Sequence, residues 1–473
     1  MIRLRSMVLA SAGALSLAAI PAACGSYSSP GTNGSSSAGS GGAGAPSSAE
    51  AGSPSNAGAS ASASAGDANG GMTGTVSGGS GGNGSAAGAS SAGAPSAAGA
   101  SSAGAPSAAG ASGAGAAGAG GASGAAGAPG TAVSLPCDVL NTGGSKCVSA
   151  HSTVRVIVPN YAGPLYQLCK GTAAAGPSSC KGTTQDVGSK DGYADSATQD
   201  TFCSGASCTI TKIYDQSGQK NDLEPAPRGG AKGTPDNPAD AAALKLTING
   251  HSAYGILIKA GIGYRSGCSG CTIKTGNGLV KGDDPETMYW VTSQKDLIDG
   301  CCFDYGNAET TSNDDGNGTM ETLYFGGGVV WGTGAGGKPG PWIMADLENG
   351  LYAGWENKQD KNISTNKALK YDFVTGVLLG DTKDKNSGKG RFALYGGDAT
   401  SGALQTMYDG IRPEKPGYVP MLKQGSIILG IGGDNSNSAG GRFYEGAVTA
   451  GPVASKQTVD ALQAAIVAAK YGK

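Results

Sequence analysis

The chain has 473 residues, of which 86 are Gly, while charged residues make up 14 % and aromatic residues 6 %. A net charge of −2 argues against a nucleic-acid partner, because such a protein needs a basic surface. With only two His residues, a His-rich metal centre is not expected either.

Residues 1–24 have the pattern of a secretory signal peptide. Arg3 and Arg5 form a positive start, residues 7–20 form a short apolar run, and small residues precede Cys24. A cysteine after Ala-Ala is typical of a bacterial lipoprotein, although Pro21 stands where a Leu-like residue is usual. We expect an exported bacterial protein, extracellular or held at the cell envelope by a lipid on Cys24. Free secretion is the alternative.

Residues 25–136 differ sharply in composition from the rest. They contain two charged residues, Glu50 and Asp67, and one aromatic residue, Tyr27. Such a segment cannot bury enough apolar surface to offset the entropy of ordering, so we expect a disordered tether. An 11-residue unit repeats at 86–96 and 97–107 without any residue suited to stacking, and it motivates a further interpretation as a structural stalk.

Residues 137–473 carry all four Trp residues and read as one all-β domain. Short β-like runs, such as 154–158, 208–214 and 288–291, alternate with Gly, Asn, Asp and Pro. Many short strands without long alternating helices indicate a sandwich or barrel. One helix is expected near the end, with Ser455 as its cap and its apolar residues recurring on one face.

The cysteines indicate a disulfide framework. Without Cys24, ten remain, and an even number is typical of exported proteins. The simplest pairing is sequential, which makes Cys268 and Cys271 a structural clip rather than a redox motif. Adjacent Cys301 and Cys302 could each have a distant partner, but sequential pairing leaves them with each other.

Two acidic motifs are candidates for chemistry. Asp346 and Glu348 are two residues apart in a strand-like run, so both carboxylates are expected on one face with Trp342. Asp434 lies just after a strand in a Gly-rich turn that lets a ligand approach the backbone. The structural alternatives are a solvated strand edge and an ordinary Asp-Asn turn. A GxGxxG pattern at 332–337 is followed by Lys-Pro-Gly-Pro, which prevents the helix that nucleotide binding needs.

The domain resembles the catalytic domain of the α-L-arabinofuranosidase B family, glycoside hydrolase family 54, along nearly all of 137–473. The resemblance rests on the runs CCFDYGNAET (301–310), GPWIMADLEN (340–349) and ILGIGGDNSN (428–437), together with shorter matches such as YDQSG at 214–218. It implies a concanavalin/laminin-G-like jelly-roll β-sandwich. It also implies a retaining hydrolase, without a cofactor, that releases terminal non-reducing α-L-arabinofuranosyl groups from arabinan or arabinoxylan.

The resemblance also assigns roles to individual residues. Glu348 corresponds to the nucleophile and Asp434 to the general acid/base. The remaining positions correspond to sugar-binding residues, with the first two joined in a vicinal disulfide: Cys301, Cys302, Trp331, Asp346, Asn349 and Gly433.

This chain departs from the family pattern in several places. Gly328 stands where a cysteine is frequent three residues before the pocket Trp, and no arabinose-binding β-trefoil follows before Lys473. The cysteine pairs 169/180 and 268/271 are additions to the pattern. We expect a monomer acting on plant cell-wall polysaccharide or arabino-oligosaccharide. The competing hypothesis is a non-catalytic carbohydrate-binding sandwich anchored as a lipoprotein.

Overall fold

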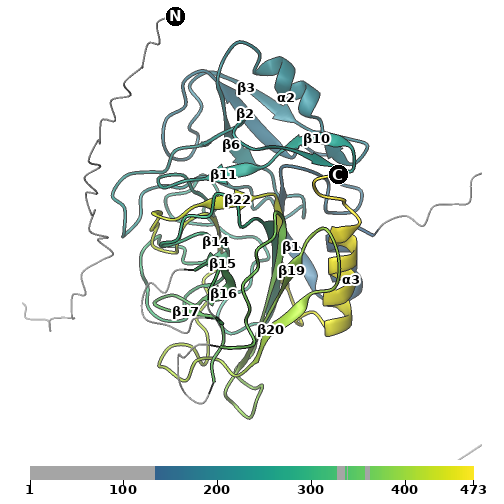
Figure 1. Cartoon of the computed structure of the whole chain (residues 1–473). Helices are drawn as coiled ribbons and strands as arrows, with labels where there is room; N and C mark the ends of the chain where they lie inside the picture. The colour runs from purple at the N-terminus through teal and green to yellow at the C-terminus, as the bar shows by residue number, and fades with distance from the viewer. Residues whose placement is uncertain (1–133, 328–335, 338, 357–362) are drawn as a thin grey trace, which may run out of the picture. The chain divides into compact units, whose positions relative to one another are not determined.

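The computed structural model of the chain describes residues 134–327, 336–337, 339–356 and 363–473 (Figure 1). The expected signal peptide, Cys24, the expected tether through residue 133, Gly328 and Trp331 lie outside the described residues. None of the helices in these described ranges is long and apolar enough to cross a membrane.

Two large antiparallel sheets dominate the described residues. The six-stranded sheet has the order β1 (Lys146–Ser152), β23 (Glu445–Ala450), β13 (Glu286–Thr292), β18 (Val374–Asp381), β19 (Arg391–Asp398) and β20 (Gln405–Gly410). The seven-stranded sheet has the order β17 (Leu351–Tyr352), β16 (Trp342–Asp346), β15 (Glu321–Gly326), β14 (Asp304–Ala308), β21 (Ser426–Leu429), β12 (Tyr264–Ser266) and β7 (Glu224–Pro225).

Smaller sheets extend this framework. A four-stranded sheet has the order β3 (Thr183–Val187), β2 (Tyr166–Lys170), β6 (Cys208–Ile213) and β8 (Ala239–Asp240). The two-stranded sheets are β10 (His251–Tyr254) with β9 (Lys245–Ile248), β11 (Ile256–Ile258) with β22 (Gly441–Phe443), and β4 (Ser189–Lys190) with β5 (Tyr193–Ala194).

The two large sheets pack face to face and form a β-sandwich. Ile343 of β16 packs against Gly376 of β18 in the opposite sheet. A Cβ added at Gly376 would lie only 2.7 Å from Ile343 Cδ1. Trp290 of β13 is fully buried between the sheets and packs on Phe303, with the ring centroids 5.0 Å apart. Burial of both faces explains why the central strands show no alternation of apolar and polar residues. The all-β expectation for 137–473 is confirmed.

Within the described residues three helices accompany the sheets, whereas the sequence indicated one. The expected helix is α3 (Lys456–Val467), and Ser455 caps it by accepting a hydrogen bond from the Thr458 N–H. The two others, α1 (Pro136–Thr142) and α2 (Ser196–Phe202), have seven residues each. A helix this short shows less than two full hydrophobic periods, so periodicity does not reveal it. Helix α1 also includes Pro136, which composition alone assigned to the tether.

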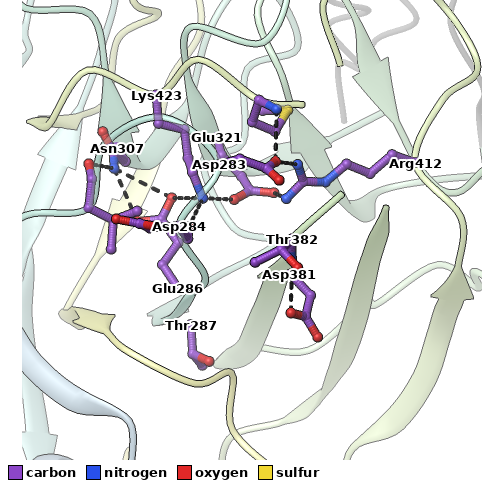
Figure 2. Close-up of polar contacts among 12 residues, drawn as sticks. Asp283, Asp284, Glu286, Thr287, Asn307, Glu321, Asp381, Thr382, Arg412 and Lys423 are labelled. Atoms are coloured by element: carbon purple, nitrogen blue, oxygen red, sulfur yellow. Dashed lines mark hydrogen bonds and ion pairs between the residues drawn. The ribbon is translucent and has the colours of Figure 1, made fainter. Parts of the chain in front are cut away.

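A network of charges, buried except for the partly exposed Asp283, joins the two sheets (Figure 2). Lys423 Nζ lies 3.2 Å from Glu286 Oε1 of β13 and 3.0 Å from Glu321 Oε2 of β15. Arg412 lies 3.5 Å from the other oxygen of Glu321 and 2.9 Å from Asp283. Every carboxylate of this network therefore has a cation within reach, which offsets the desolvation that burial imposes.

Sequential cysteine pairing is confirmed by five disulfides. They join Cys137 to Cys147, Cys169 to Cys180, Cys203 to Cys208, Cys268 to Cys271, and Cys301 to Cys302. Each disulfide joins two cysteines that are consecutive in the sequence, so all five close short loops.

Candidate active site

The two acids after β16 differ in backbone conformation. Asp346 is the last residue of the strand, and Glu348 follows it with a φ of +61°. The expectation that one continuous strand places both side chains on the same face is therefore wrong. Instead, the Glu348 N–H donates a 3.1 Å hydrogen bond to Asp346 Oδ1, and the Tyr418 hydroxyl donates one of 2.8 Å to the Glu348 carbonyl. These bonds hold Glu348 in a left-handed conformation that costs a non-glycine residue energy and is typical of functional sites.

The vicinal disulfide lies directly against this turn. Cys301 and Cys302 are buried, and Cys302 Sγ lies 3.5 Å from Asp346 Oδ2. Ser436 links the disulfide to the second acidic motif, because its Oγ lies 2.8 Å from Cys301 Sγ and its N–H donates a 3.0 Å bond to Asp434 Oδ1. Sulfur, Asp346 and Asp434 are thus parts of one connected site.

The turn that carries Gly433 and Asp434 approaches Glu348 closely. A Cβ at Gly433 would lie 2.9 Å from Glu348 Oε2 and would collide with the carboxyl of Glu309. A side chain at position 433 would therefore displace these two carboxyl groups. Buried Arg265 fixes the turn by donating to the main-chain oxygens of Gly433, at 2.5 Å, and of Glu309. Burial lowers the pKa of Arg265 to about 10, although neighbouring carboxylates oppose the shift.

Glu309, which follows β14, is the direct partner of Glu348. A Cβ at Gly433 would lie within 3 Å of oxygens of both carboxyl groups, so the two side chains meet at this point. Burial first, and then the charge of Glu309, raises the pKa of Glu348 well above its ordinary value. Burial also raises the pKa of Glu309. The pair therefore titrates as a unit.

Thr319 anchors the carboxyl of Glu309. Its hydroxyl lies 2.6 Å from the carbonyl oxygen of Gly316 and donates to Glu309 Oε1 at 2.7 Å. This contact holds the Glu309 carboxyl in place beside Glu348.

Asp304 lies beneath Asp346 and is fully buried. Burial, together with the charge of Asp346, raises the pKa of Asp304 well above its usual range, and burial raises the pKa of Asp346 to about 8. Two such carboxyl groups in contact cannot both ionise readily. We infer that they form a hydrogen-bonded pair with at least one proton, which supports the floor of the site.

The same residues could suggest a metal centre, but their chemistry does not fit one. Ligand atoms of Cys302, Asp304 and Asp346 lie within 4.8 Å of one another. The sulfur of Cys302 is engaged in the disulfide and is not the thiolate that metal binding requires. The two buried carboxyl groups that remain share at least one proton, which makes them poor ligands.

The structure thus brings together Cys301, Cys302, Asp346, Glu348, Gly433 and Asp434. Asn349 is exposed, and its side-chain amide donates to Asp314 at 2.9 Å, while Trp331 lies outside the described residues. Sequence reasoning missed Glu309, Asp304, Arg265 and Ser436. Three of these stand inside the distinctive runs 301–310 and 428–437, which could have drawn attention to them, whereas Arg265 gives no local signal.

Comparison with known proteins supports the resemblance found in the sequence. The model of the family "Alpha-L-arabinofuranosidase B, catalytic" matches residues 136–472. The chain belongs to this family. The probable α-L-arabinofuranosidase B of Aspergillus fumigatus is 48 % identical over 345 residues, covering 72 % of this chain and 63 % of the relative. The α-L-arabinofuranosidase B of Emericella nidulans is 48 % identical over 343 residues, covering 71 % and 62 %.

Solved structures of the α-L-arabinofuranosidase family agree. An arabinofuranosidase in complex with arabinofuranosyl-α-1,2-xylobiose has a TM-score of 0.64 and 42 % identity, covering 72 % of this chain and 66 % of that protein. A GH54 α-L-arabinofuranosidase soaked with a cyclic sulfate inhibitor has a TM-score of 0.64 and 43 % identity, covering 71 % and 66 %. This chain therefore spans about 63 % of the length of its curated relatives. Those relatives are fungal, and they give no support to the expectation of a bacterial lipoprotein.

Proposed function

We propose that this member of the α-L-arabinofuranosidase B family is a retaining glycoside hydrolase that releases terminal non-reducing α-L-arabinofuranosyl groups. The observation that supports it most is the convergence of Glu348 and Asp434 beside Gly433, within a group of buried carboxyls. Two carboxyl groups on either side of a sugar are the machinery of retaining glycosidases.

In the first step, a carboxylate oxygen of Glu348 forms a bond to the anomeric carbon while the glycosidic C–O bond breaks. Asp434 gives its proton to the departing oxygen, so the aglycone leaves as an alcohol. In the second step, Asp434 takes a proton from water, the water oxygen bonds to the anomeric carbon, and the ester to Glu348 breaks. Asp346, Asn349, Trp331, Gly433 and the Cys301–Cys302 disulfide are the proposed sugar-binding groups.

Hydrolysis of 4-nitrophenyl α-L-arabinofuranoside by the full chain tests the activity. In the presence of methanol, a retaining enzyme transfers the sugar and forms the methyl α-L-arabinofuranoside, which NMR identifies. Formation of the β-anomer would contradict the assignment of Glu348 as nucleophile. Binding of arabinose without turnover would instead favour the non-catalytic carbohydrate-binding alternative.

The further parts of the proposal concern substrate and location. We propose arabinan or arabinoxylan-type polysaccharide as the substrate, a concanavalin/laminin-G-like jelly-roll as the finer class of the sandwich, and a monomeric state. Export follows from the signal-like residues 1–24 and from the five disulfides, which persist in oxidising compartments. Lipid attachment at Cys24 is tested by mass spectrometry of the mature N-terminus, where an unmodified residue would leave plain secretion.

A further inference from the structure

Arg265 of β12 is a buried cation, 1 % exposed, that forms no salt bridge within the described residues. The other buried Lys and Arg residues of the described ranges each form one, and they are Arg155, Arg412 and Lys423. Removing a guanidinium from water costs free energy, which a paired carboxylate normally offsets. A buried arginine without such a partner therefore needs another explanation.

The guanidinium of Arg265 joins the two segments that carry the acids of the site. Nη1 donates a hydrogen bond of 2.5 Å to the Gly433 carbonyl, and Nη2 donates one to the Glu309 carbonyl. Gly433 directly precedes Asp434, and the side chain of Glu309 meets that of Glu348. The two N–H groups belong to one rigid planar fork, so they fix the spacing between the two segments.

Ser426 of β21 holds the guanidinium in this orientation. Its hydroxyl accepts a 3.2 Å hydrogen bond from Arg265 Nε and donates one of 2.6 Å to the Ser266 carbonyl. Each of the three guanidinium nitrogens therefore has an acceptor. Because the turn at Gly433 has no room for even a Cβ beside the carboxyls, a shift of the guanidinium would change how the acid/base turn stands against the nucleophile.

The charge of Arg265 also acts on the site. Burial lowers its pKa to about 10, so the side chain remains cationic at neutral pH. The carboxylates of Glu309, Glu348 and Asp434 oppose that shift, as does Asp315, which is exposed and screened by water. Because a Coulomb interaction is mutual, the guanidinium favours the ionised form of these acids in return.

The other charged groups around Arg265 have partners of their own. Glu224 lies opposite Arg265 in the register of β7 and β12, and it forms a salt bridge of 3.2 Å with Lys212. Asp304 and Asp346 belong to the separate pair that supports the floor of the site. The groups left to balance the guanidinium charge are the proposed nucleophile with its neighbouring carboxyl and the proposed acid/base.

We propose that Arg265 is a positioning residue for the hydrolysis: its fork aligns the acid/base turn with the nucleophile, and its charge lets the buried carboxyls hold the negative charge that the reaction needs. This inference rests on the proposed function. Arg265 acts through Gly433 and Glu309, because its contacts are two main-chain oxygens and a hydroxyl.

Arg265→Lys tests the fork while it keeps the charge. A single ammonium cannot hold both carbonyls at a fixed spacing, so Asp434 loses its alignment. We expect kcat/KM to fall at least about thirtyfold for methyl α-L-arabinofuranoside, whose leaving group needs a proton, and less than about fivefold for the 4-nitrophenyl glycoside, whose leaving group needs little. Arg155→Lys is the matched control, because Arg155 is also buried but pairs with Glu445, and the ratio of the two substrates should not change.

Arg265→Gln tests the charge. Without the cation the pKa of Glu348 rises, so the acid limb of the kcat/KM profile on the aryl substrate should move to higher pH, by about one unit. Arg265→Lys should leave that limb in place. If the Gln variant does not fold, the substrate ratio of the Lys variant still decides.

Equal losses of Arg265→Lys on the two substrates, or an unmoved acid limb in a folded Arg265→Gln, would overturn the inference. Either result would leave the hydrolase assignment intact, because the wild-type protein would still cleave the aryl substrate. A wild-type protein inactive on that substrate would instead overturn the proposed function.

Discussion

Two groups of buried carboxyls in the described residues differ in how they are neutralised. Glu286 and Glu321 share Lys423, and Glu321 also contacts Arg412 (Figure 2). By contrast, no Lys or Arg within the described ranges forms a salt bridge with the four acids of the site, which are Asp304, Glu309, Asp346 and Glu348. The nearby Arg265 donates to main-chain carbonyls and to Ser426.

The pKa values follow this difference. Burial would raise the pKa of Glu321, but Lys423 and Arg412 outweigh burial and lower it. Burial raises the pKa of Glu286 to about 7 against the opposing charge of Lys423. In the site, burial and like charges act in the same direction on Glu348 and Asp304. The paired group thus contributes to the fold, whereas the unpaired group holds protons that chemistry can use.

Replacing the proposed nucleophile gives the largest expected effect. Glu348→Gln should lower kcat on an aryl arabinofuranoside at least about a thousandfold, roughly 4 kcal/mol in barrier terms, because the amide cannot form the covalent ester. Its melting temperature should be equal to or above that of the wild type, since the change removes a buried acid that has no cation. Retention of more than about a tenth of the activity would refute the assignment.

Removing the cation shared by Glu286 and Glu321 should instead destabilise the fold. Lys423→Met leaves Glu286 and Glu321 without their shared cation, so the free energy of unfolding should fall by about 3–5 kcal/mol in denaturant titrations. The control is Lys295→Met, which removes an exposed pair with Asp372 and should cost no more than about 1 kcal/mol. Equal losses in the two variants would show that burial does not distinguish these ion pairs.

Removing the vicinal disulfide between Cys301 and Cys302 tests the sulfur surface that lies against the buried carboxyls of the site. The double change of Cys301 and Cys302 to Ala should raise KM and lower kcat/KM by about tenfold, because a preorganised sugar-binding surface is lost. The melting temperature should barely change, since a ring between neighbours restrains the unfolded chain very little. Replacing Cys137 and Cys147 by Ala should do the reverse, with a stability loss of about 2–4 kcal/mol and unchanged kinetics. Unchanged kinetics in the first variant would exclude the disulfide from the sugar site.

The sequence predicts the carboxyls of the site better than the carboxyls that pair with Lys423 and Arg412. The runs that contain Glu348, Asp434 and the cysteine pair carry their own signals, and short spacings make sequential disulfides simple. The pairing of Lys423 with Glu286 and Glu321 joins residues more than a hundred positions apart, so it depends on strand order, which local pattern does not reveal. Asp304 stands in a strand whose residues are all buried, so no alternation distinguishes it. The left-handed turn at Glu348 depends on the hydrogen bond from Tyr418, which is 70 residues away in the sequence.

Neutralising Glu309 tests its role as a positioning residue. Glu309→Gln keeps a side-chain oxygen that can accept the hydrogen bond from Thr319, so kcat should stay within about tenfold of the wild type. Because the variant cannot place a second negative charge beside Glu348, the pKa of Glu348 falls, and the acid limb of the kcat/KM profile should move to lower pH. A structural role alone would leave that limb in place. Glu309→Ala, which loses the contact with Thr319, should lower kcat further.

The smallest expected effect concerns Asp304, which supports the site without touching the sugar. Its pKa is raised in the folded protein, whereas in the unfolded chain it loses its proton near pH 4. Between these values the native state binds more protons than the unfolded state, so its contribution to the free energy of unfolding decreases as pH rises. Asp304→Asn cannot ionise and removes this decrease. The melting temperature of the variant relative to wild type should therefore increase from pH 4 to pH 8, reaching about 2–4 °C, or ~1 kcal/mol. A relative decrease over that range would mean that Asp304 has a cationic partner when folded, and the contrast between the two carboxyl groups would fail.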